Sequence, residues 1–265
     1  MSEYRTETDS MGELQVPADA LYQAQTQRAV NNFSISGLAM PKQFITALAY
    51  VKQAAAQSNC ELGHLDKQKA QAIERACQEI IDGQHLEHFP IDVFQTGSGT
   101  STNMNANEVI ATLASRYSDA LIHPNDDVNM GQSSNDVIPT TIAVSSVINV
   151  VYELFPALDQ LSQMLERKKA EVGDIVKTGR THLMDAMPVT FSQTLNTWQH
   201  QVDTAMAAIR HSLDGVSALA QGGTAVGTGV NADPQFAEQF CKNLSNNVGI
   251  RFTPSKNFFY NIGSQ

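Results

Sequence analysis

The sequence of 265 residues is poor in cysteine and has no clustered metal-binding histidines. Its three cysteines, Cys60, Cys77 and Cys241, are far apart and form no C-x-x-C pair, so we expect buried free thiols, not a disulfide framework or a zinc site. The seven histidines include no H-x-x-x-H or H-E-x-x-H pattern. These absences argue against a catalytic metal, and we expect no metal and no cofactor.

Positive charge is scarce as well. Lys and Arg number 17 against 27 Asp and Glu, which gives a formal net charge of −10 at pH 7. Nucleic acids and anionic membrane surfaces are bound through basic patches, so we expect neither as a partner. No segment approaches the roughly 18 apolar residues of a membrane span, and the N-terminus lacks the apolar core of a signal peptide. We therefore expect a cytoplasmic protein.

The first half of the chain reads as an irregular arm followed by helices. Residues 1–40 mix charges with glycine and proline, which predicts an arm with a small strand pair. From residue 41 apolar side chains recur at spacings of three and four, which predicts a helix over 41–63. Asp66 is a good N-cap for a second helix over 66–83, and a third is expected from about 103 to 117.

The second half is more regular. Apolar residues alternate spacings of three and four over 144–165 and again over 191–213, as in the seam of a coiled coil. We expect two long antiparallel helices, the first bent at Pro156. A further helix is predicted over 234–247, with Asp233 as its N-cap.

Helices of this length imply association. Segments of 25 to 35 residues span roughly 40 to 50 Å at 1.5 Å per residue, which exceeds the width of a compact domain of about 130 residues. Much of their apolar surface must therefore meet another chain. We expect an oligomer in which long helices from several subunits share one bundle.

Three polar stretches interrupt the helical pattern: Gln95–Ser101, Gln132–Asp136 and Gly179–Leu183. Their serines, threonines, asparagines and glycines weaken helices, so a stable bundle has no need of them. Hydroxyls and the N–H groups of helix starts suit a small carboxylate. Within the third stretch, Thr181 can donate to a carboxylate and His182 can exchange a proton near neutral pH.

Each stretch also has a simpler explanation. The glycine-rich loop before residue 103 serves equally well as a helix-capping loop, and Asp136 alone would suffice as a cap. The His123–Asp126 segment is predicted as a turn, in which a histidine is usually only solvated. Gly222–Gly229 is superficially similar to a dinucleotide loop, but we expect no strand before it and no β-α-β alternation around it, which excludes a Rossmann fold.

Taken together, the stretches resemble the class II fumarases, the iron-independent fumarate hydratases of the fumarase/aspartase superfamily. Aspartases usually have Ala, Thr and Gln where this chain has Ser98, Ser134 and His182. Argininosuccinate and adenylosuccinate lyases share the architecture but lack this combination of motifs. The resemblance extends in order and spacing to Asp9–Gly12, Val16–Asp19, Gln25–Arg28, Gln95–Asn107 and Gly222–Asn231.

The resemblance implies a mainly all-α, fumarase/aspartase-like fold. A small mixed N-terminal lyase domain would occupy residues 1–131, and residues 132–265 would hold the first long helices of a central helical bundle. The family assembles as a homotetramer in which three subunits contribute to each active site. We therefore expect the same assembly here.

The implied activity is the reversible anti hydration of fumarate to L-malate, a reaction of the tricarboxylic acid cycle, through a carbanion-like aci-carboxylate. Donors already aimed at the carboxylate that gains charge would stabilise the transition state. His182 would orient or relay protons through a water. The substrate carboxylates would be bound by Ser98, Gly99, Thr100, Ser133, Ser134, Asn135 and Thr181. The family's second dicarboxylate site would map to His123, Pro124, Asn125 and Asp126, although Ala120–Ile122 replaces the basic residues often found before it.

One part of the family pattern does not occur in these 265 residues. The mobile G-S-S-x-M-P-x-K-x-N loop, with the proton-abstracting serine and a substrate-binding lysine and asparagine, would fall some tens of residues beyond Gln265. We therefore expect a truncated fumarase that is inactive alone. The alternative is a non-catalytic helical assembly or interaction module derived from a fumarase, against which the retained polar stretches argue.

Overall fold

The computed structural model describes residues 4–9 and 11–263. Ser10, within the Asp9–Gly12 motif, and the last two residues lie outside the described part. The contacts form two compact units: unit 1 is Met1–Ser146 with Ser217–Gln265, and unit 2 is Val147–Val216. The domain division at 131/132, which rests on the family resemblance, stays a prediction.

Unit 1 begins with the predicted strand pair. Strands β1 (Tyr4–Asp9) and β2 (Gly12–Pro17) form an antiparallel hairpin. The helix that follows, α1 (Ala24–Asn32), was not predicted, because its glutamines and asparagines show no apolar stripe. Its start is instead fixed from a distance: the carboxylate of Glu108 accepts the backbone N–H groups of Gln23, Gln25 and Thr26.

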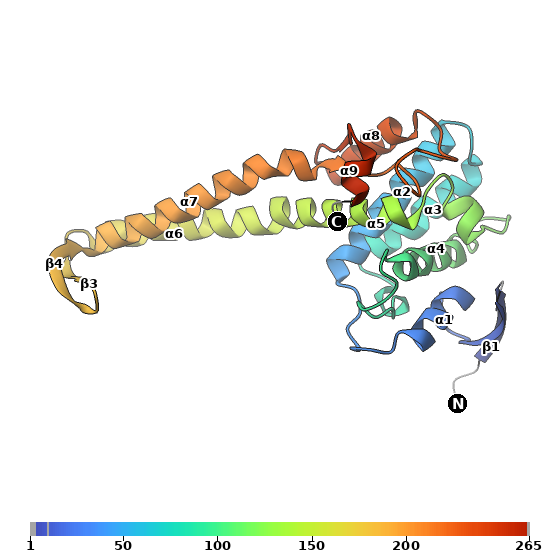
Figure 1. The fold of residues 1–265 in the computed structure, drawn as a ribbon, viewed down its shortest axis with the longest axis horizontal. Helices are drawn as coiled ribbons and strands as arrows, with labels where there is room; N and C mark the ends of the chain where they lie inside the picture. Colours follow the sequence, from blue (N-terminus) through green and yellow to red (C-terminus); the bar gives the residue numbers. More distant parts are fainter. Residues whose placement is uncertain (1–3, 10, 264–265) are drawn as a thin grey trace. The chain divides into compact units, whose positions relative to one another are not determined.

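Four further helices form the core of unit 1 (Figure 1): α2 (Lys42–Glu61), α3 (Lys67–Ile81), α4 (Thr100–Ala114) and α8 (Phe236–Val248). Helix α2 packs against α3 and α8, and α3 packs against α4. The expected cap of α3 is confirmed, because the Asp66 side chain accepts the N–H groups of Gln68 and Lys69. Two predicted starts were wrong: α4 begins at Thr100, not 103, and α8 begins at Phe236, not 234. Asp233, whose side chain accepts the Gln235 N–H, lies three residues ahead of α8.

Short elements complete unit 1. A 3-10 turn covers Leu86–His88 and a five-residue π turn covers Pro124–Val128. Strand β5 (Ala218–Leu219) pairs in parallel with β6 (Thr253–Pro254), ahead of α9 (Phe258–Gly263). The expectation that no strand precedes the 222–229 loop was therefore wrong. The loop still opens no helix, since α8 begins only at Phe236, and the two-residue strands form no Rossmann sheet.

Unit 2 is a helical hairpin entered through α5 (Ser134–Asn149), which continues through a π turn (Val150–Leu154) into α6 (Phe155–Val172). Helix α7 (Phe191–Val216) packs antiparallel against α6, as predicted (Figure 1). Pro156 lies at the start of α6, directly after the π turn, so the wider turn accommodates the proline without ending the helix.

The polar connector predicted at 179–183 is in fact a β-hairpin. Strands β3 (Val176–Thr181) and β4 (Met184–Thr190) pair antiparallel between α6 and α7. The two turn residues, His182 and Leu183, have φ of 49° and 62°, as a type I′ turn requires. The sequence lacks the usual Asn-Gly signal of such a turn, so this hairpin was missed.

The helices of unit 2 bury little. Within α6 and α7, whose residues are all described, one side chain in each is buried: Phe155 and Met206. The continuous helix Ser134–Val172 contains an 18-residue window of mean hydropathy 1.5, of which 22% is buried, so it could cross a membrane by length and composition. This is weak support for a membrane span, because a helix made to pack in a bundle has the same properties.

Candidate functional site

Two of the predicted polar stretches meet at adjoining helix starts in unit 1. Gly99, the N-cap of α4, has a φ of 67°, and a Cβ added there would lie 2.9 Å from Ile138 Cγ1 on α5. Only glycine meets both conditions without strain. The glycine therefore allows the loop ahead of α4 to approach the first turns of α5.

Three hydroxyls form a chain at this meeting point. The Oγ1 atom of Thr100 lies 2.8 Å from Ser98 Oγ and 2.8 Å from Ser134 Oγ. All three side chains are half-buried. Because Thr100 and Ser134 are the first residues of α4 and α5, the positive ends of two helix dipoles face the same hydroxyls. The arrangement suits a small anion such as a carboxylate.

Four backbone N–H groups beside this chain already have partners. The side chain of Thr96 accepts the Ser101 N–H, and Gln95 accepts the Thr102 N–H. At the start of α5, Ser133 Oγ accepts the Asn135 N–H, and the Ser133 N–H donates to Asp136 in return. This reciprocal pair is a capping box. A ligand would have to displace these four partners, whereas the hydroxyl hydrogens of the chain can rotate toward it.

Asp136 does more than the predicted cap. Its Oδ2 atom also accepts the N–H groups of Gly222 and Thr224, at 3.1 and 2.8 Å. Asn135 Nδ2 donates to the Ala225 carbonyl at 2.7 Å. Burial raises the pKa of Asp136, and the backbone N–H groups that it accepts partly oppose that rise. The carboxylate therefore holds the 222–225 loop against the first turn of α5.

A buried amide and amine network lies behind the Gln132–Asp136 stretch, and sequence reasoning missed it. Lys52 Nζ donates to Asn129 Oδ1 at 2.9 Å and to Gln132 Oε1 at 3.0 Å. Asn103 Nδ2, from α4, also donates to Asn129 Oδ1. The available signal was a lysine within the apolar pattern of the helix over 41–63.

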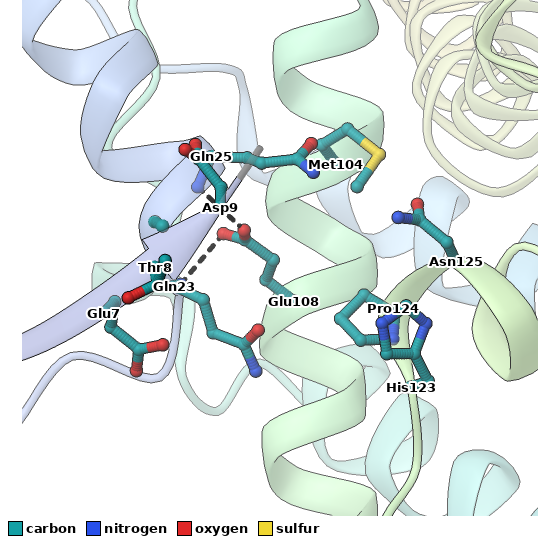
Figure 2. A pocket seen from close by; sticks show the side chains of 11 residues that line it. Glu7, Thr8, Asp9, Gln23, Gln25, Met104, Glu108, His123, Pro124 and Asn125 are labelled. Atoms are coloured by element: carbon teal, nitrogen blue, oxygen red, sulfur yellow. Dashed lines mark hydrogen bonds between the residues drawn. The ribbon is translucent and has the colours of Figure 1, made fainter. Parts of the chain in front are cut away.

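The second predicted site borders a cavity of about 330 Å³ (Figure 2). His123, Pro124 and Asn125 lie on one side of Glu108, and the Gln23–Gln25 segment lies on the other. The turn is held in place because the Asp127 carboxylate accepts the His123 N–H and pairs with Lys69.

The charges around this cavity are unfavourable for a dianion. Its walls include the carboxylates of Glu7, Asp9 and Glu108. The guanidinium of Arg28 beside Asp9 lowers the pKa of that carboxyl, which keeps it ionised. Burial raises the pKa of Glu108, so this carboxylate takes up a proton more readily than an exposed one as the pH falls. The fourth predicted residue, Asp126, borders a different cavity of about 490 Å³, together with Ser133 and Thr224.

Thr181 and His182 belong to unit 2. Thr181 ends β3 and His182 begins the hairpin turn, and both side chains are exposed. The neighbouring Arg180 borders a cavity of about 680 Å³ that also includes Lys168 and Lys177. The structure thus groups the predicted substrate-binding residues in two sets. One is the unit 1 set, Ser98, Gly99, Thr100, Ser133, Ser134 and Asn135, and the other is the hairpin pair in unit 2.

One group among the described residues has the composition of a metal site. His85, Glu87 and His88 offer ligand atoms within 4.8 Å of one another. His85 Nε2 is already hydrogen-bonded to Glu79 at 2.9 Å, and burial lowers the pKa of His88. The group does not touch the hydroxyl chain's residues in any described hydrogen bond, so the expectation of no catalytic metal is unchanged and stays a prediction.

Comparisons with known proteins point in one direction. Residues 12–264 match the lyase family. A class II fumarate hydratase of Pseudomonas aeruginosa is 55% identical over 100% of this chain and 58% of its own length, and one of Bacillus subtilis is 46% identical over 99% and 58%. The crystal structure of a class II fumarase from Schistosoma mansoni has a TM-score of 0.94 at 37% identity, covering 98% of this chain and 59% of that one. The chain therefore spans a little under three fifths of the relatives that it matches.

Proposed function

Because the chain belongs to the lyase family and is similar to class II fumarate hydratases along its whole length, we propose that the complete protein catalyses the reversible hydration of fumarate to L-malate. The observation that best supports this is the chain of hydroxyls from Ser98 through Thr100 to Ser134, between two helix starts. The substrate would be a dicarboxylate, and no cofactor is needed for the reaction.

The hydroxyl chain fits the chemistry of this reaction. Removing a proton from the carbon beside a carboxylate moves negative charge onto that carboxylate. Donors fixed in advance stabilise the charge as it develops, and such preorganised groups are commonly worth 10²- to 10³-fold in rate each. Ser98, Thr100 and Ser134 would hold this carboxylate, while Ser133 and Asn135 complete the pocket.

Two further parts of the site are proposals from the family. Thr181 would bind the substrate, and His182 would orient or relay protons through a water, both from the hairpin of unit 2. Binding of a second dicarboxylate beside His123 is disfavoured by the acidic walls of its cavity, and we propose that this site is weak here.

We propose that the protein is a homotetramer. The support is the exposed apolar surface of unit 2, where large side chains face outward on helices that bury little of their own surface. Examples are Tyr152, Leu161, Met164 and Trp198. Shared bundle helices would cover these side chains. The unpaired thiols are consistent with a reducing, cytoplasmic location, which we also propose.

We further propose that the 265 residues alone do not complete an active site, since the family's serine loop does not occur in them. The competing proposal is a non-catalytic helical module. The preserved hydroxyl chain favours the enzyme, because a scaffold would be more stable with apolar or helix-forming residues at these positions.

The test compares two lengths of the protein. The complete protein encoded by the reading frame is expected to convert fumarate to L-malate and to leave L-aspartate unchanged. The conversion is measured as the loss of fumarate absorbance. The 265-residue chain is expected to show no turnover. Absence of activity in the complete, folded protein would contradict the proposed function, and robust turnover by the shorter chain would contradict its incompleteness.

A further inference from the structure

Lys52 is a charged side chain placed entirely inside unit 1. It lies on α2 with 0% of its surface exposed. Within the part of the chain that the structure describes, its Nζ atom forms no ion pair and donates to two amide oxygens instead. Burying an ammonium in this way is costly unless polar groups replace its water. The partners of Lys52 therefore indicate which part of the structure the buried ammonium holds in place.

Those partners are two amide oxygens in the segment that leads into the hydroxyl site. Asn129 and Gln132 both accept from Lys52, and Asn129 Nδ2 donates to the Gln132 carbonyl at 3.2 Å. Gln132 directly precedes Ser133, which caps α5. The ammonium thus fixes the turn from which Ser133, Ser134 and Asn135 extend.

The same network reaches the other half of the site. Asn103 on α4 donates to Asn129 Oδ1, the oxygen that Lys52 also holds, at 3.2 Å. Helix α4 carries Thr100 at its start. The Lys52 amine is therefore hydrogen-bonded to the network that links the start of α4 to the start of α5.

Two titratable groups influence Lys52. Asp136 on α5 favours the charged form of Lys52, and a thiolate at Cys77 on α3 would act in the same direction. Burial raises the pKa of that thiol, so Cys77 stays neutral at physiological pH. Burial also lowers the pKa of Lys52 to about 7, well below the ordinary value for a lysine. Its charge therefore changes near neutral pH.

We propose that Lys52 is a positioning residue for the hydration reaction: its ammonium holds Asn129 and Gln132, and through them sets the carboxylate-binding hydroxyls at the starts of α4 and α5. This inference rests on the proposed function. Lys52 itself does not touch the substrate. Losing the proton leaves an amine that still donates but carries no charge, so both hydrogen bonds weaken and the positive potential behind the site falls.

The test uses the complete protein with Lys52→Met, a side chain of similar length without charge. Lys42→Met, an exposed lysine on the same helix, is the matched control. KM and kcat are measured for fumarate from pH 6 to 9. At pH 6 we expect Lys52→Met to raise KM roughly tenfold, as the loss of one charged hydrogen bond would. The excess over wild type should shrink above pH 7, because the wild-type lysine also becomes neutral. The control should match wild type throughout.

The outcomes separate the two proposals. A wild type without turnover contradicts the proposed function and this inference with it. An active wild type whose KM ratio to Lys52→Met is unity, or is the same at every pH, overturns the positioning role alone. If Lys52→Met does not fold, Gln132→Glu provides the test. The wild-type KM is expected to rise above pH 7 as Lys52 loses its proton, and a carboxylate beside the amine should shift this rise to higher pH in the variant. A variant whose KM rises at the same pH as that of the wild type overturns the inference.

Discussion

The two units of this protein differ in how much apolar surface they bury by themselves. In unit 1, side chains such as Phe236 and Phe240 on α8 are fully buried, and even Lys52 is enclosed by polar partners. In unit 2, Trp198 remains 51% exposed although it lies on a long amphipathic helix. Unit 1 therefore has a core of its own, and unit 2 leaves large apolar side chains exposed.

The largest effect should come from removing core volume in unit 1. Phe240→Ala deletes a fully buried ring and is expected to lower the free energy of unfolding by about 3–5 kcal/mol. Chemical denaturation of the wild type and variant measures the difference. The exposed Phe259→Ala is the control, and a loss for Phe240→Ala as small as that of the control would contradict the account of unit 1 as the self-contained part.

Gly99→Ala should have the next largest effect. The alanine must adopt a positive φ, and its Cβ would lie 2.9 Å from Ile138 Cγ1. We therefore expect a loss of about 2 kcal/mol in unfolding free energy. Gly97→Ala, which has open space around its Cβ and no positive φ, is the matched control. Equal melting temperatures for the two variants would show that the approach of the loop to α5 is not required.

The buried amine of unit 1 also predicts a pH dependence of stability. Lys52 has a pKa of about 7 when folded and an ordinary, higher pKa when unfolded, so above pH 7 the unfolded state binds more protons. Its contribution to the unfolding free energy should therefore rise with pH, by up to about 1.4 kcal/mol per pH unit, and stay flat below pH 7. Denaturation at pH 6, 7 and 8 checks this. A slope that Lys52→Met leaves unchanged would assign the effect to other groups.

A helix cap gives a smaller effect. Asp66 accepts two N–H groups at the start of α3, so Asp66→Ala is expected to cost about 1 kcal/mol. Asp66→Asn keeps an accepting oxygen and should recover most of this loss in the same thermal melt. If Asn behaves like Ala, the carboxylate's charge matters more than its cap hydrogen bonds.

The smallest effect on the fold should be in unit 2. Trp198→Ala removes a large but half-exposed side chain, and we expect a change below about 0.5 kcal/mol in the unfolding free energy of a single subunit. Its effect should appear in association instead. Sedimentation velocity should show smaller species for this variant than for wild type, and unaltered sedimentation would place the subunit contacts elsewhere.

The same contrast explains which parts of the fold the sequence could predict. Helices α2, α3 and α7 follow from apolar spacing, and Asp66 marks the start of α3, because these signals are local. Helix α1 could not be predicted, since Glu108, more than 80 residues away, caps its start. The β3–β4 hairpin was missed because its turn residues, His182 and Leu183, are uncommon at positive φ.

The candidate site divides in a similar way. Ser98, Ser134 and His182 were found by resemblance to a family, and the polar stretches that contain them were visible as interruptions of helical pattern. The convergence of two helix starts on one hydroxyl chain is a tertiary fact that spacing does not contain. The pairing of Lys52 with Gln132 joins residues 80 positions apart in sequence. The available signal, a lysine within the apolar pattern of the helix over 41–63, was not used, and it would not have revealed the partner.

The central claim is that the hydroxyl chain binds the carboxylate whose charge grows during hydration. The direct measurement is kcat/KM for fumarate in the complete protein with Thr100→Val, which replaces the central hydroxyl by a methyl group. We expect a loss of roughly 10²-fold or more, with the fold and melting temperature retained. Ser146→Ala, on the exposed side of α5, should match wild type. Wild-type kcat/KM in Thr100→Val would contradict the account.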